Sequence, residues 1–291
     1  MTQYPHLAIL VPSPDNEQHA ASWPGLFETL AAPLRAKGAK VTPEPWFGGP
    51  PARALLAYDA VLPLLAWGYH LKAQAWADRL RAWDDLGVKL THPARLLAWN
   101  TTKSYLAQLA DLGAPVVPSL MTEDLTWQDL DRARAMFDSE LLVIKPQISA
   151  GSHQTMVHFP DDEPDDLPQG PVIVQPFLPA VGEEGEWSLF YFGGQFSHAV
   201  IKVARTGDFR VQPQFGGRVR QVMPSPEAFD AAQSVLRAVD QDLVYARIDL
   251  IRCLDGDLRL MELELIEPNL FLEHAPDHGA AFADAIMASL D

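Results

Sequence analysis

The sequence has very little cysteine: Cys253 is the single example in 291 residues. One cysteine excludes an intramolecular disulfide framework and a zinc site built from several cysteines. Basic residues are also scarce, with 22 Lys and Arg against 38 Asp and Glu, which gives a formal net charge of −16. A surface of this sign repels nucleic-acid backbones and anionic membranes, so we expect neither as a partner.

Several short enzyme motifs are missing as well. No G-x-G-x-x-G follows the first expected strand, which argues against a dinucleotide-binding Rossmann domain. No G-x-x-x-x-G-K-[ST], G-x-S-x-G or H-E-x-x-H occurs, and this disfavours a P-loop protein, an α/β-hydrolase and a zinc protease. No basic segment followed by an apolar run opens the sequence, and no apolar stretch could span a bilayer. We therefore expect a soluble cytoplasmic protein.

What is present is an alternation of strand and helix patterns. In the first third, strands are expected at 7–11, 41–46 and 60–65, and helices at 23–37, ending at Gly38, and at 71–86. This alternation predicts a small α/β domain with a parallel sheet. The chain is long for one compact domain, so we expect two or three subdomains around one cleft.

The middle of the chain shows the same alternation of strand and helix patterns, and the last third is richer in strands. In the middle we expect a helix capped by Asn100 or Thr101 and running to Leu112, a helix over 126–137 capped by Thr126, strands at 141–146 and 172–178, and an exposed loop at 161–171. In the last third we expect strands at 188–192, 196–204, 245–253 and 258–267, and helices at 226–239 and 277–290.

Three acidic residues fall on the last expected hairpin. Asp249 lies in its first strand, and Glu262 and Glu264 lie two apart in its second, so the two glutamates share a face. The turn at 255–257 folds the strands together and lets the three carboxylates converge. Converging carboxylates repel one another unless cations accompany them, and oxygen ligands suit Mg²⁺. The alternative is a solvated acidic face, which the many apolar neighbours in 260–266 disfavour.

Two further segments have the composition of a nucleotide site. Lys145 ends an expected strand and precedes the small-residue stretch 149–155, a combination that suits phosphate oxygens. Residues 175–178 could offer backbone groups to an adenine edge, and the glutamates at 183–186 could offer a carboxylate to ribose hydroxyls. Taken singly, each is also compatible with an ordinary strand end beside a loop.

A third segment, 207–222, places Arg210, Arg218 and Arg220 close together in a protein with few cations. Arginine forms bidentate contacts with phosphate or carboxylate, and the adjacent Gly216 and Gly217 allow a ligand to approach the backbone. The cluster therefore indicates an anion site.

These elements, in this order, resemble the ATP-grasp superfamily, above all the glutathione-synthetase-like and RimK-like ligases and the cyclo-ligase that makes cycloserine. The matching stretch runs from about Asn100 to Phe271. The resemblance implies an α/β (α+β) ATP-grasp fold with an N-terminal pre-ATP-grasp α/β domain. The implied divisions are an N-terminal domain (1–97), an ATP-grasp small or lid subdomain (98–178) and a C-terminal subdomain with the metal site (179–291).

The resemblance also implies the cofactors and site residues. ATP and Mg²⁺ are the implied cofactors, with two ions expected and Mn²⁺ as a substitute, on Asp249, Glu262 and Glu264. The implied nucleotide-binding residues are Lys103, Lys145, Ser149, Gly151, Ser152, Gln175, Phe177, Leu178, Glu183, Glu186 and Lys202. The implied catalytic residues are Lys145 and Arg210, and the substrate-binding candidates are Arg218, Arg220, Arg247 and Asn269.

The metal motif departs from the family in one respect. Its spacing is that of D-alanine:D-alanine ligases, but the family's final Asn is Glu264 here. The added negative charge leaves open whether Glu267 or Asn269 shares the ligation.

The implied chemistry is ATP-dependent ligation through an acyl phosphate, in which a small carboxylate takes the γ-phosphate and an amine or similar nucleophile then displaces it. A cyclo-ligase, in which acid and nucleophile belong to one molecule, stays open. A non-catalytic ATP-binding sensor or scaffold is a further alternative. Trp67, Tyr69 and Trp99 are candidates for lining the acceptor cleft, and a homodimer is compatible with the sequence.

Overall fold

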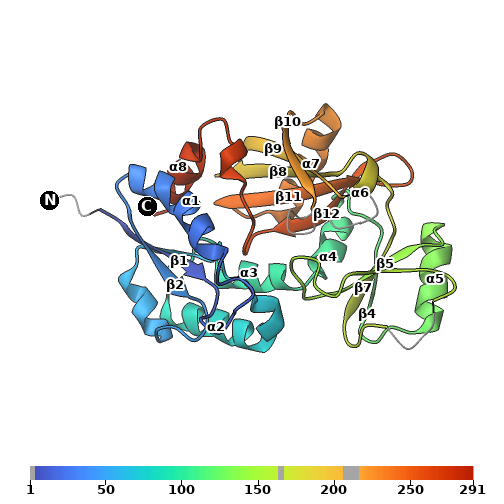
Figure 1. Ribbon diagram of the computed structural model, residues 1–291, viewed down its shortest axis with the longest axis horizontal. Coiled ribbons are helices and arrows are strands. Elements are labelled where there is room, and N and C mark those ends of the chain that lie inside the picture. The colour runs from blue at the N-terminus through green and yellow to red at the C-terminus, as the bar shows by residue number, and fades with distance from the viewer. Residues whose placement is uncertain (1–3, 163–166, 206–215, 291) are drawn as a thin grey trace.

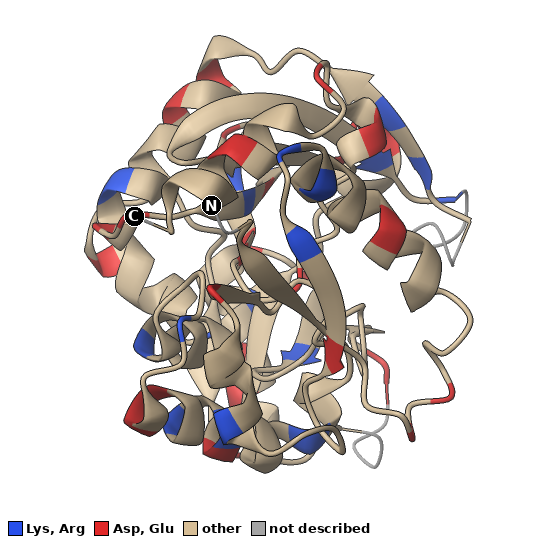
Figure 2. Cartoon of the chain, turned by 90° about the vertical axis from the view of Figure 1, so that its left-hand side faces the viewer, with Lys and Arg blue, Asp and Glu red and all other residues tan. Residues whose placement is uncertain are grey.

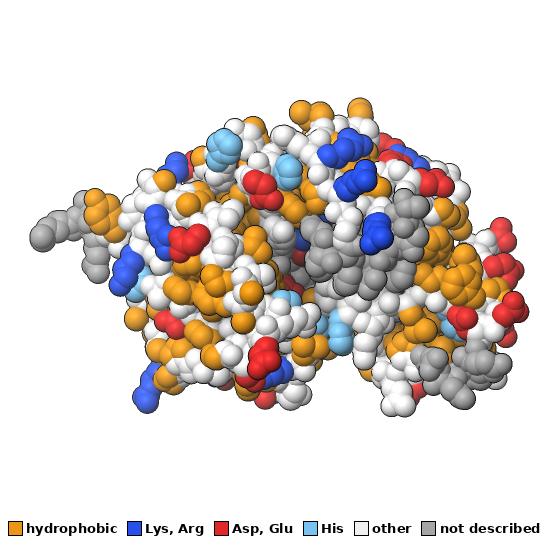
Figure 3. Space-filling view, viewed as in Figure 1, with side chains coloured by type: hydrophobic (Ala, Val, Ile, Leu, Met, Phe, Trp, Pro, Cys, Tyr) orange, Lys and Arg blue, Asp and Glu red, His pale blue; other side chains and the backbone are white. Residues whose placement is uncertain are grey.

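The computed structural model describes residues 4–162, 167–205 and 216–290, and these residues form three sheets with helices packed around them. In Figure 1 the N-terminal sheet lies at the left, the five-stranded sheet at the top centre, and the four-stranded sheet in a lobe at the right. The space-filling outline is indented between the N-terminal half and that lobe (Figure 3).

The N-terminal sheet is parallel, with the strand order β2-β1-β3. Its region contains β1 (His6–Val11), α1 (Trp23–Ala36), β2 (Lys40–Pro45), η1 (Ala52–Ala57), β3 (Ala60–Leu62), η2 (Tyr69–Lys72) and α2 (Ala73–Leu86). Alternate residues of β1 face two cores. Leu7 and Ile9 pack in the core that also holds residues of α1 and of α8 (Ala280–Ala288), whereas Leu10 packs with residues of α2. The predicted small α/β domain is thus present, and the C-terminal helix covers it.

The second sheet is antiparallel, in the order β4-β7-β5-β6, and forms the lobe at the right of Figure 1. Its elements are β4 (Leu120–Thr122), α5 (Trp127–Phe137), β5 (Leu142–Pro146), β6 (Met156–His158) and β7 (Val172–Pro176). Helix α5 buries Leu130, Ala133 and Phe137 against the apolar face of this sheet. The helix begins at Trp127 with Thr126 as its N-cap, as the sequence predicted, and Thr126 and Asp129 form a capping box.

The third sheet is antiparallel, in the order β10-β9-β8-β11-β12. Its elements are α6 (Ala180–Glu183), β8 (Glu186–Phe192), β9 (Gln195–Val203), β10 (Arg218–Val222), α7 (Pro226–Val239), β11 (Tyr245–Arg252), β12 (Leu258–Glu264) and η5 (Leu272–His274). One face carries Leu189, Ile248 and Leu263 and packs against α7 and α4 (Tyr105–Asp111). The opposite face carries the polar residues that build the site.

One expected helix is divided in two, and one strand was not expected from the sequence. The helix expected from Asn100 or Thr101 to Leu112 is two helices, α3 (Ala94–Thr101) and α4, because Thr102 has an extended backbone with φ −107° and ψ 124°. Residues 218–222, for which the sequence indicated part of an arginine cluster and no strand, form the edge strand β10, which pairs with β9. Both features depend on partners distant in sequence, which local patterns do not contain.

Charge is mixed over the outer elements of the molecule. In Figure 2 blue Lys and Arg segments alternate with red Asp and Glu segments over the outer helices and loops, without one basic face on the side drawn there. Of the helices that the structure describes, none has both the length and the apolar character needed to cross a bilayer.

Candidate active site

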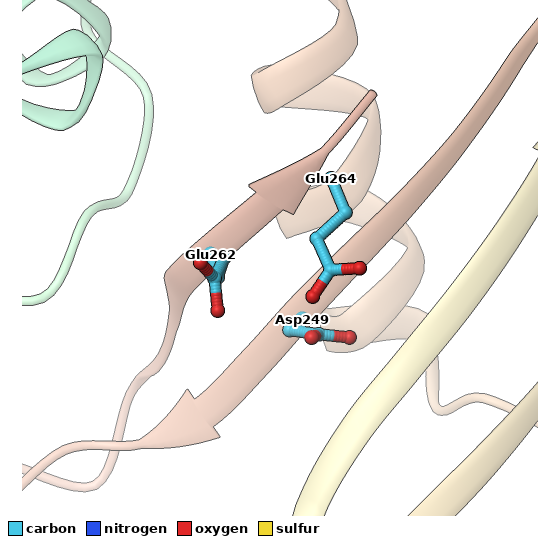
Figure 4. A group of neighbouring side chains, drawn as sticks. All are labelled: Asp249, Glu262 and Glu264. Carbon is cyan, nitrogen blue, oxygen red and sulfur yellow. The ribbon is translucent and has the colours of Figure 1, made fainter. Parts of the chain in front are cut away.

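Three carboxylates converge on the polar face of the five-stranded sheet. In the antiparallel pair β11 and β12, Asp249 lies opposite Glu262, and Arg247 lies opposite Glu264. One carboxylate oxygen from each of Asp249, Glu262 and Glu264 lies within 4.8 Å of the others. Figure 4 shows the carboxylates of the two strands gathered in one space. The convergence that the sequence predicted is therefore present.

The backbone that carries these glutamates is held by side chains from α3 and α4. Asn100 donates a hydrogen bond to the carbonyl of Leu263 at 2.9 Å and accepts one from the N–H of Leu265 at 3.0 Å. The hydroxyl of Tyr105 accepts a hydrogen bond from the N–H of Leu263 at 2.9 Å. The residues on both sides of Glu264 are thus fixed by helices more than a hundred and fifty residues earlier in the chain.

Cationic side chains accompany each carboxylate. Lys103, at the break between α3 and α4, donates to Oε1 of Glu262 at 2.5 Å and to the carbonyl of Ser149 at 3.1 Å. Arg247 binds Asp249 through Nε, at 3.0 Å from Oδ1, and through Nη2, at 2.8 Å from Oδ2. The same guanidinium forms an ion pair with Glu264.

A second carboxylate–lysine group lies beside Asp249 on the neighbouring strands. Lys202 of β9 donates to Oδ2 of Asp249 at 3.2 Å and forms an ion pair with Glu186 of β8. Ser188 donates to Oδ1 of Asp249 at 2.5 Å. Gly185 makes the entry to β8 possible, because it has φ +94° and a Cβ there would lie 2.7 Å from the carbonyl of Lys202.

The pKa values of the acids differ according to their cations. Burial disfavours ionisation of Asp249, but Arg247 and Lys202 outweigh it and hold its pKa well below the usual range. Burial likewise opposes ionisation of Glu262, whose pKa is nevertheless lowered by Lys103 and Lys145. For Glu264, burial and the nearby Glu262 and Asp249 raise the pKa to about 8 despite Arg247. A divalent cation would favour the charged form of all three.

Lys145 faces the same group of charges from the four-stranded sheet. It lies at the end of β5, is buried, and feels the charges of Glu262 and Glu186. Burial and the neighbouring Lys103 lower its pKa to about 8. Among the described residues Lys103, not Lys145, is the lysine that forms an ion pair with Glu262. The Lys145 ammonium is therefore left available for an anion.

The expected adenine segment lies where the two antiparallel sheets meet. Gln175 is buried in β7 and donates to the hydroxyl of Ser119 at 2.8 Å, and the N–H of Phe177 donates to the carbonyl of Leu141 at 2.9 Å. Leu178 packs in a small apolar cluster with Val117 and Met261. Met261 is the extra residue of a bulge in β12, immediately before Glu262. This cluster offers apolar surface beside the carboxylates.

The other residues predicted to bind the nucleotide differ in burial: some are buried beside the lysines of the site, and others are exposed. In the loop after β5, Ser149 is buried and accepts from Lys103, whereas Gly151 is exposed with φ +60° and Ser152 also has a positive φ. Of the two acids proposed for ribose, Glu183 is exposed, and Glu186 is buried beside Lys202. Burial raises the pKa of Glu186 to about 7.

The arginines proposed for substrate binding separate into two groups. Arg218 and Arg220 are exposed, and they lie opposite Val203 and Ile201 of β9, on the face away from Lys202. Arg247 belongs to the carboxylate group, and its Nη1 donates to the carbonyl of Asn269 at 3.5 Å. Arg210 lies outside the described residues. The structure thus joins Arg247 and Asn269 to the site, but not Arg218 or Arg220.

Sequence reasoning missed several residues that build this site. Ser188 follows Glu186 by two positions, so strand alternation could have found it. Asn100 was interpreted as a helix cap, and Tyr105 was not singled out, because their partners lie across the molecule. Of the aromatic candidates, Tyr69 is buried within electrostatic reach of Glu262, Glu264 and Glu267, whereas Trp99 packs on the apolar core beside Tyr105.

The arrangement fits a magnesium nucleotide on chemical grounds. Three carboxylates supply oxygen ligands of the kind that Mg²⁺ prefers, and they lie close enough together to hold a metal ion. Lys103, Lys145 and Lys202 surround them with cations suited to phosphate oxygens.

No family model matches the chain. Among curated proteins, the chain is 30% identical over 242 residues to the cycloserine biosynthesis protein DcsG of Streptomyces lavendulae, covering 74% of this chain and 80% of that protein. It is also 30% identical over 218 residues to glutathione synthetase of Prochlorococcus marinus (strain MIT 9313), covering 69% of this chain and 64% of that enzyme.

Solved structures show the same fold. The D-cycloserine synthetase DcsG superposes with a TM-score of 0.83 at 23% identity, over 98% of this chain and 100% of that one. The ATP-grasp ligase PsnB, in a complex with Mg and ADP, gives a TM-score of 0.64 at 20% identity, over 99% of each chain. D-alanine–D-alanine ligase from Bacillus anthracis, complexed with ATP, gives 0.68 at 15% identity, over 99% of this chain and 97% of that one.

Proposed function

The chain belongs to the ATP-grasp ligases, and we propose that it activates a small carboxylate with ATP as an acyl phosphate that an amine then attacks. ATP-dependent carboxylate–amine ligation is the activity of this family. The observation that carries the proposal is the convergence of Asp249, Glu262 and Glu264 beside the buried Lys145. The relatives are ligases, and this disfavours the sensor or scaffold hypothesis.

Asp249, Glu262 and Glu264 would hold the metal, with two Mg²⁺ ions proposed and Mn²⁺ as a substitute. The metal would neutralise phosphate charge. Lys103 and Lys145 would hold phosphate oxygens from either side, and Lys202 with Glu186 would complete the nucleotide site. Residues 175–178 and Met261 would bind the adenine, and the loop at 149–155 would exclude water from the acyl phosphate.

The remaining roles follow from the same geometry. Arg247 keeps Asp249 ionised and lies next to Asn269, so we propose both for orientation of the substrate. Arg210 is kept as a proposed catalytic residue outside the described part of the chain. We also propose the division into residues 1–97, 98–178 and 179–291, each of which contains one whole sheet. Helix α4 nevertheless packs against the C-terminal sheet.

We propose that the protein acts in the cytoplasm on small-molecule substrates. We propose neither nucleic acid nor a membrane as a partner. Two forms of the reaction are compatible with the site. In one, acid and amine are separate molecules. In the other, they belong to one molecule, which closes into a ring, and the similarity to DcsG favours testing this form directly. A homodimer stays a prediction, for which sedimentation is the measurement.

The test is phosphate release from Mg-ATP across panels of carboxylic acids, with and without amines. We expect release with a matching substrate, and a hydroxamate when hydroxylamine is added. Lys145→Ala and Glu262→Gln should abolish release, whereas the exposed Lys89→Ala should not. Release with one substrate alone, together with loss of water from it, identifies a cyclo-ligase. Absence of Mg-dependent ATP binding in calorimetry would refute the proposed function.

A further inference from the structure

The backbone ladder between β11 and β12 ends at the carboxylate group. Its last residue pair is Arg247 and Glu264, whose side chains form an ion pair. Beyond this pair β12 stops and the chain bends at Leu265, whereas β11 extends two residues further, to Tyr245. Among the described residues no further backbone pair joins the two strands at this end, so another contact must set their separation beside Arg247 and Glu264.

The side chain of His92 bridges the two strands where the ladder has ended. This residue lies two positions before α3, is 0% exposed, and has its Nδ1 3.1 Å from the carbonyl oxygen of Leu265. Its Nε2 accepts a long hydrogen bond, of 3.5 Å, from the N–H of Tyr245, and the centroids of the two rings lie 4.4 Å apart. His92 thus joins the first residue of β11 to the residue that follows β12.

The two contacts specify the protonation state of His92. Nε2 faces an N–H group, so it is the acceptor, and Nδ1 then carries the proton that is donated to Leu265. Burial lowers the pKa of His92 to about 4, which keeps the ring neutral at physiological pH. A neutral ring with a donor on one nitrogen and an acceptor on the other takes the place that a peptide group would have between two paired strands.

The residue next to Glu264 is therefore held by side chains at both of its backbone groups. The N–H of Leu265 donates to Asn100, and its carbonyl accepts from His92. Both printed contacts of His92 are to backbone atoms, so it acts on the carboxylates through the chain that carries them. A displacement of Leu265 would move Glu264 relative to Arg247, its partner across the ladder.

We propose that His92 is a positioning residue of the metal site, which fixes the open end of the β11–β12 hairpin at the spacing at which Arg247 binds both Asp249 and Glu264. This inference rests on the proposed metal–nucleotide site and adds to it a residue that is too deeply buried to contact either ligand. With the hairpin fixed in this way, the carboxylates keep their arrangement before a metal binds. Such preorganisation lowers the free-energy cost of binding the metal.

The main test is His92→Phe, which keeps a ring beside Tyr245 and removes both hydrogen bonds. Binding of Mn²⁺ in the presence of ADP is measured by electron paramagnetic resonance, which needs no turnover. We expect this variant to bind Mn²⁺ roughly 10-fold more weakly than the wild type, the lower end of the range for residues that support metal ligands. His92→Asn keeps a donor close to the position of Nδ1, so its affinity should lie between those of the wild type and His92→Phe.

His158→Phe is the matched control. His158 is also a buried histidine with a hydrogen bond, to Arg134, but it lies in the four-stranded sheet. Both phenylalanine variants should have a lower thermal midpoint than the wild type, whereas His158→Phe should bind Mn²⁺ with ADP as the wild type does. Wild-type Mn²⁺ affinity in folded His92→Phe would overturn the inference, and so would an equal weakening in His158→Phe.

A measurement on the wild type decides if the His92 variants do not fold. In NMR spectra the ring nitrogens of His92 should report a neutral ring with its proton on Nδ1, both before and after Mg-ADP is added. A proton on Nε2, or a charged ring, would mean that His92 does not bridge the two strands. If the wild type binds no Mn²⁺ in the presence of ADP, the proposed metal–nucleotide site fails instead, whatever the state of His92.

Discussion

The ammonium of Lys103 donates a hydrogen bond to Oε1 of Glu262 at 2.5 Å, although 159 residues separate the two in the chain. The Lys103 side chain is 8% exposed and that of Glu262 is 28% exposed, so water screens the pair only in part. The pair links the break between α3 and α4 to the carboxylates of the last hairpin. Each partner therefore depends on the other for neutralisation when no metal is bound.

The first prediction follows from that pair. Lys103→Met should lower the free energy of unfolding by about 1 to 3 kcal/mol, less than for a fully buried pair because Glu262 is partly exposed. Adding Glu262→Gln to this variant should restore stability, since the unpaired charge is then gone. Urea unfolding of the four proteins of the double-mutant cycle measures the coupling. Strictly additive effects would show that the two side chains do not interact in solution.

The second prediction concerns pH and Lys145. Its pKa is lowered to about 8 by burial and by Lys103, so its ammonium loses its proton as the pH rises through that value. Phosphate binds the charged form, so Lys145 should take up about half a proton when ATP binds near pH 8. Calorimetry in buffers of different ionisation enthalpy measures this uptake. Lys145→Arg, which stays charged, should take up about half a proton less than the wild type, while ionisation of Glu264 on metal binding contributes to both proteins. Equal proton uptake in the two proteins would contradict the shift.

The third prediction concerns the acid that replaces the family's asparagine. Glu264→Asn removes one negative charge from a crowded group in which burial, Glu262 and Asp249 raise the pKa of Glu264 to about 8. We expect the Mg²⁺ concentration for half-maximal activity to rise roughly 10-fold or more, because a charged ligand is lost. Stability without metal should not fall, since Asn adds no buried charge. A magnesium titration of phosphate release checks the first effect, and wild-type metal dependence in Glu264→Asn would show that the charge of Glu264 does not contribute to metal binding.

The fourth prediction distinguishes the two groups of arginines. Arg247→Lys loses the two-point contact with Asp249, so kcat/KM should fall roughly 10- to 100-fold, as for loss of a charged hydrogen bond. Arg220→Lys is the matched control, because Arg220 is exposed on the other face of the sheet, and it should stay within about twofold of the wild type. Steady-state kinetics with the same substrate decides. If kcat/KM fell equally in both variants, Arg220 would contribute to the active site as much as Arg247, and the placement of the two arginines on opposite faces of the sheet would be wrong for the active enzyme.

The parts of the fold that were predictable are those whose causes are local. The cap of α5 needs only Thr126 and Asp129, which exchange hydrogen bonds across one turn. The hairpin of β11 and β12 needs only alternation and a turn, and alternation alone placed Glu262 and Glu264 on one face. The resemblance to ATP-grasp ligases was likewise readable, because it rests on the order of motifs along the chain.

The parts that were not predictable depend on distant partners. Thr102 interrupts a helix so that Lys103 can reach Ser149 and Glu262, and no neighbouring residue signals this. Strand β10 exists because it pairs with β9, and its sequence alone suggested only a cluster of charge. Glu186 and Glu183 were equal candidates in the sequence, and the pairing of Glu186 with Lys202 across the sheet could not be predicted from their neighbours.

The anchoring of β12 by Asn100 and Tyr105 has a mechanical consequence. Because these side chains tie α3 and α4 to the backbone on either side of Glu264, the carboxylates and Lys103 should move as one rigid body. Lys145 belongs to the four-stranded sheet, which is joined to this body by the hydrogen bond from Lys103 to the carbonyl of Ser149 and by Ile173, which packs in the core of the five-stranded sheet. The position of Lys145 relative to the carboxylates therefore depends on this junction between the two sheets, whereas the carboxylates keep their own arrangement.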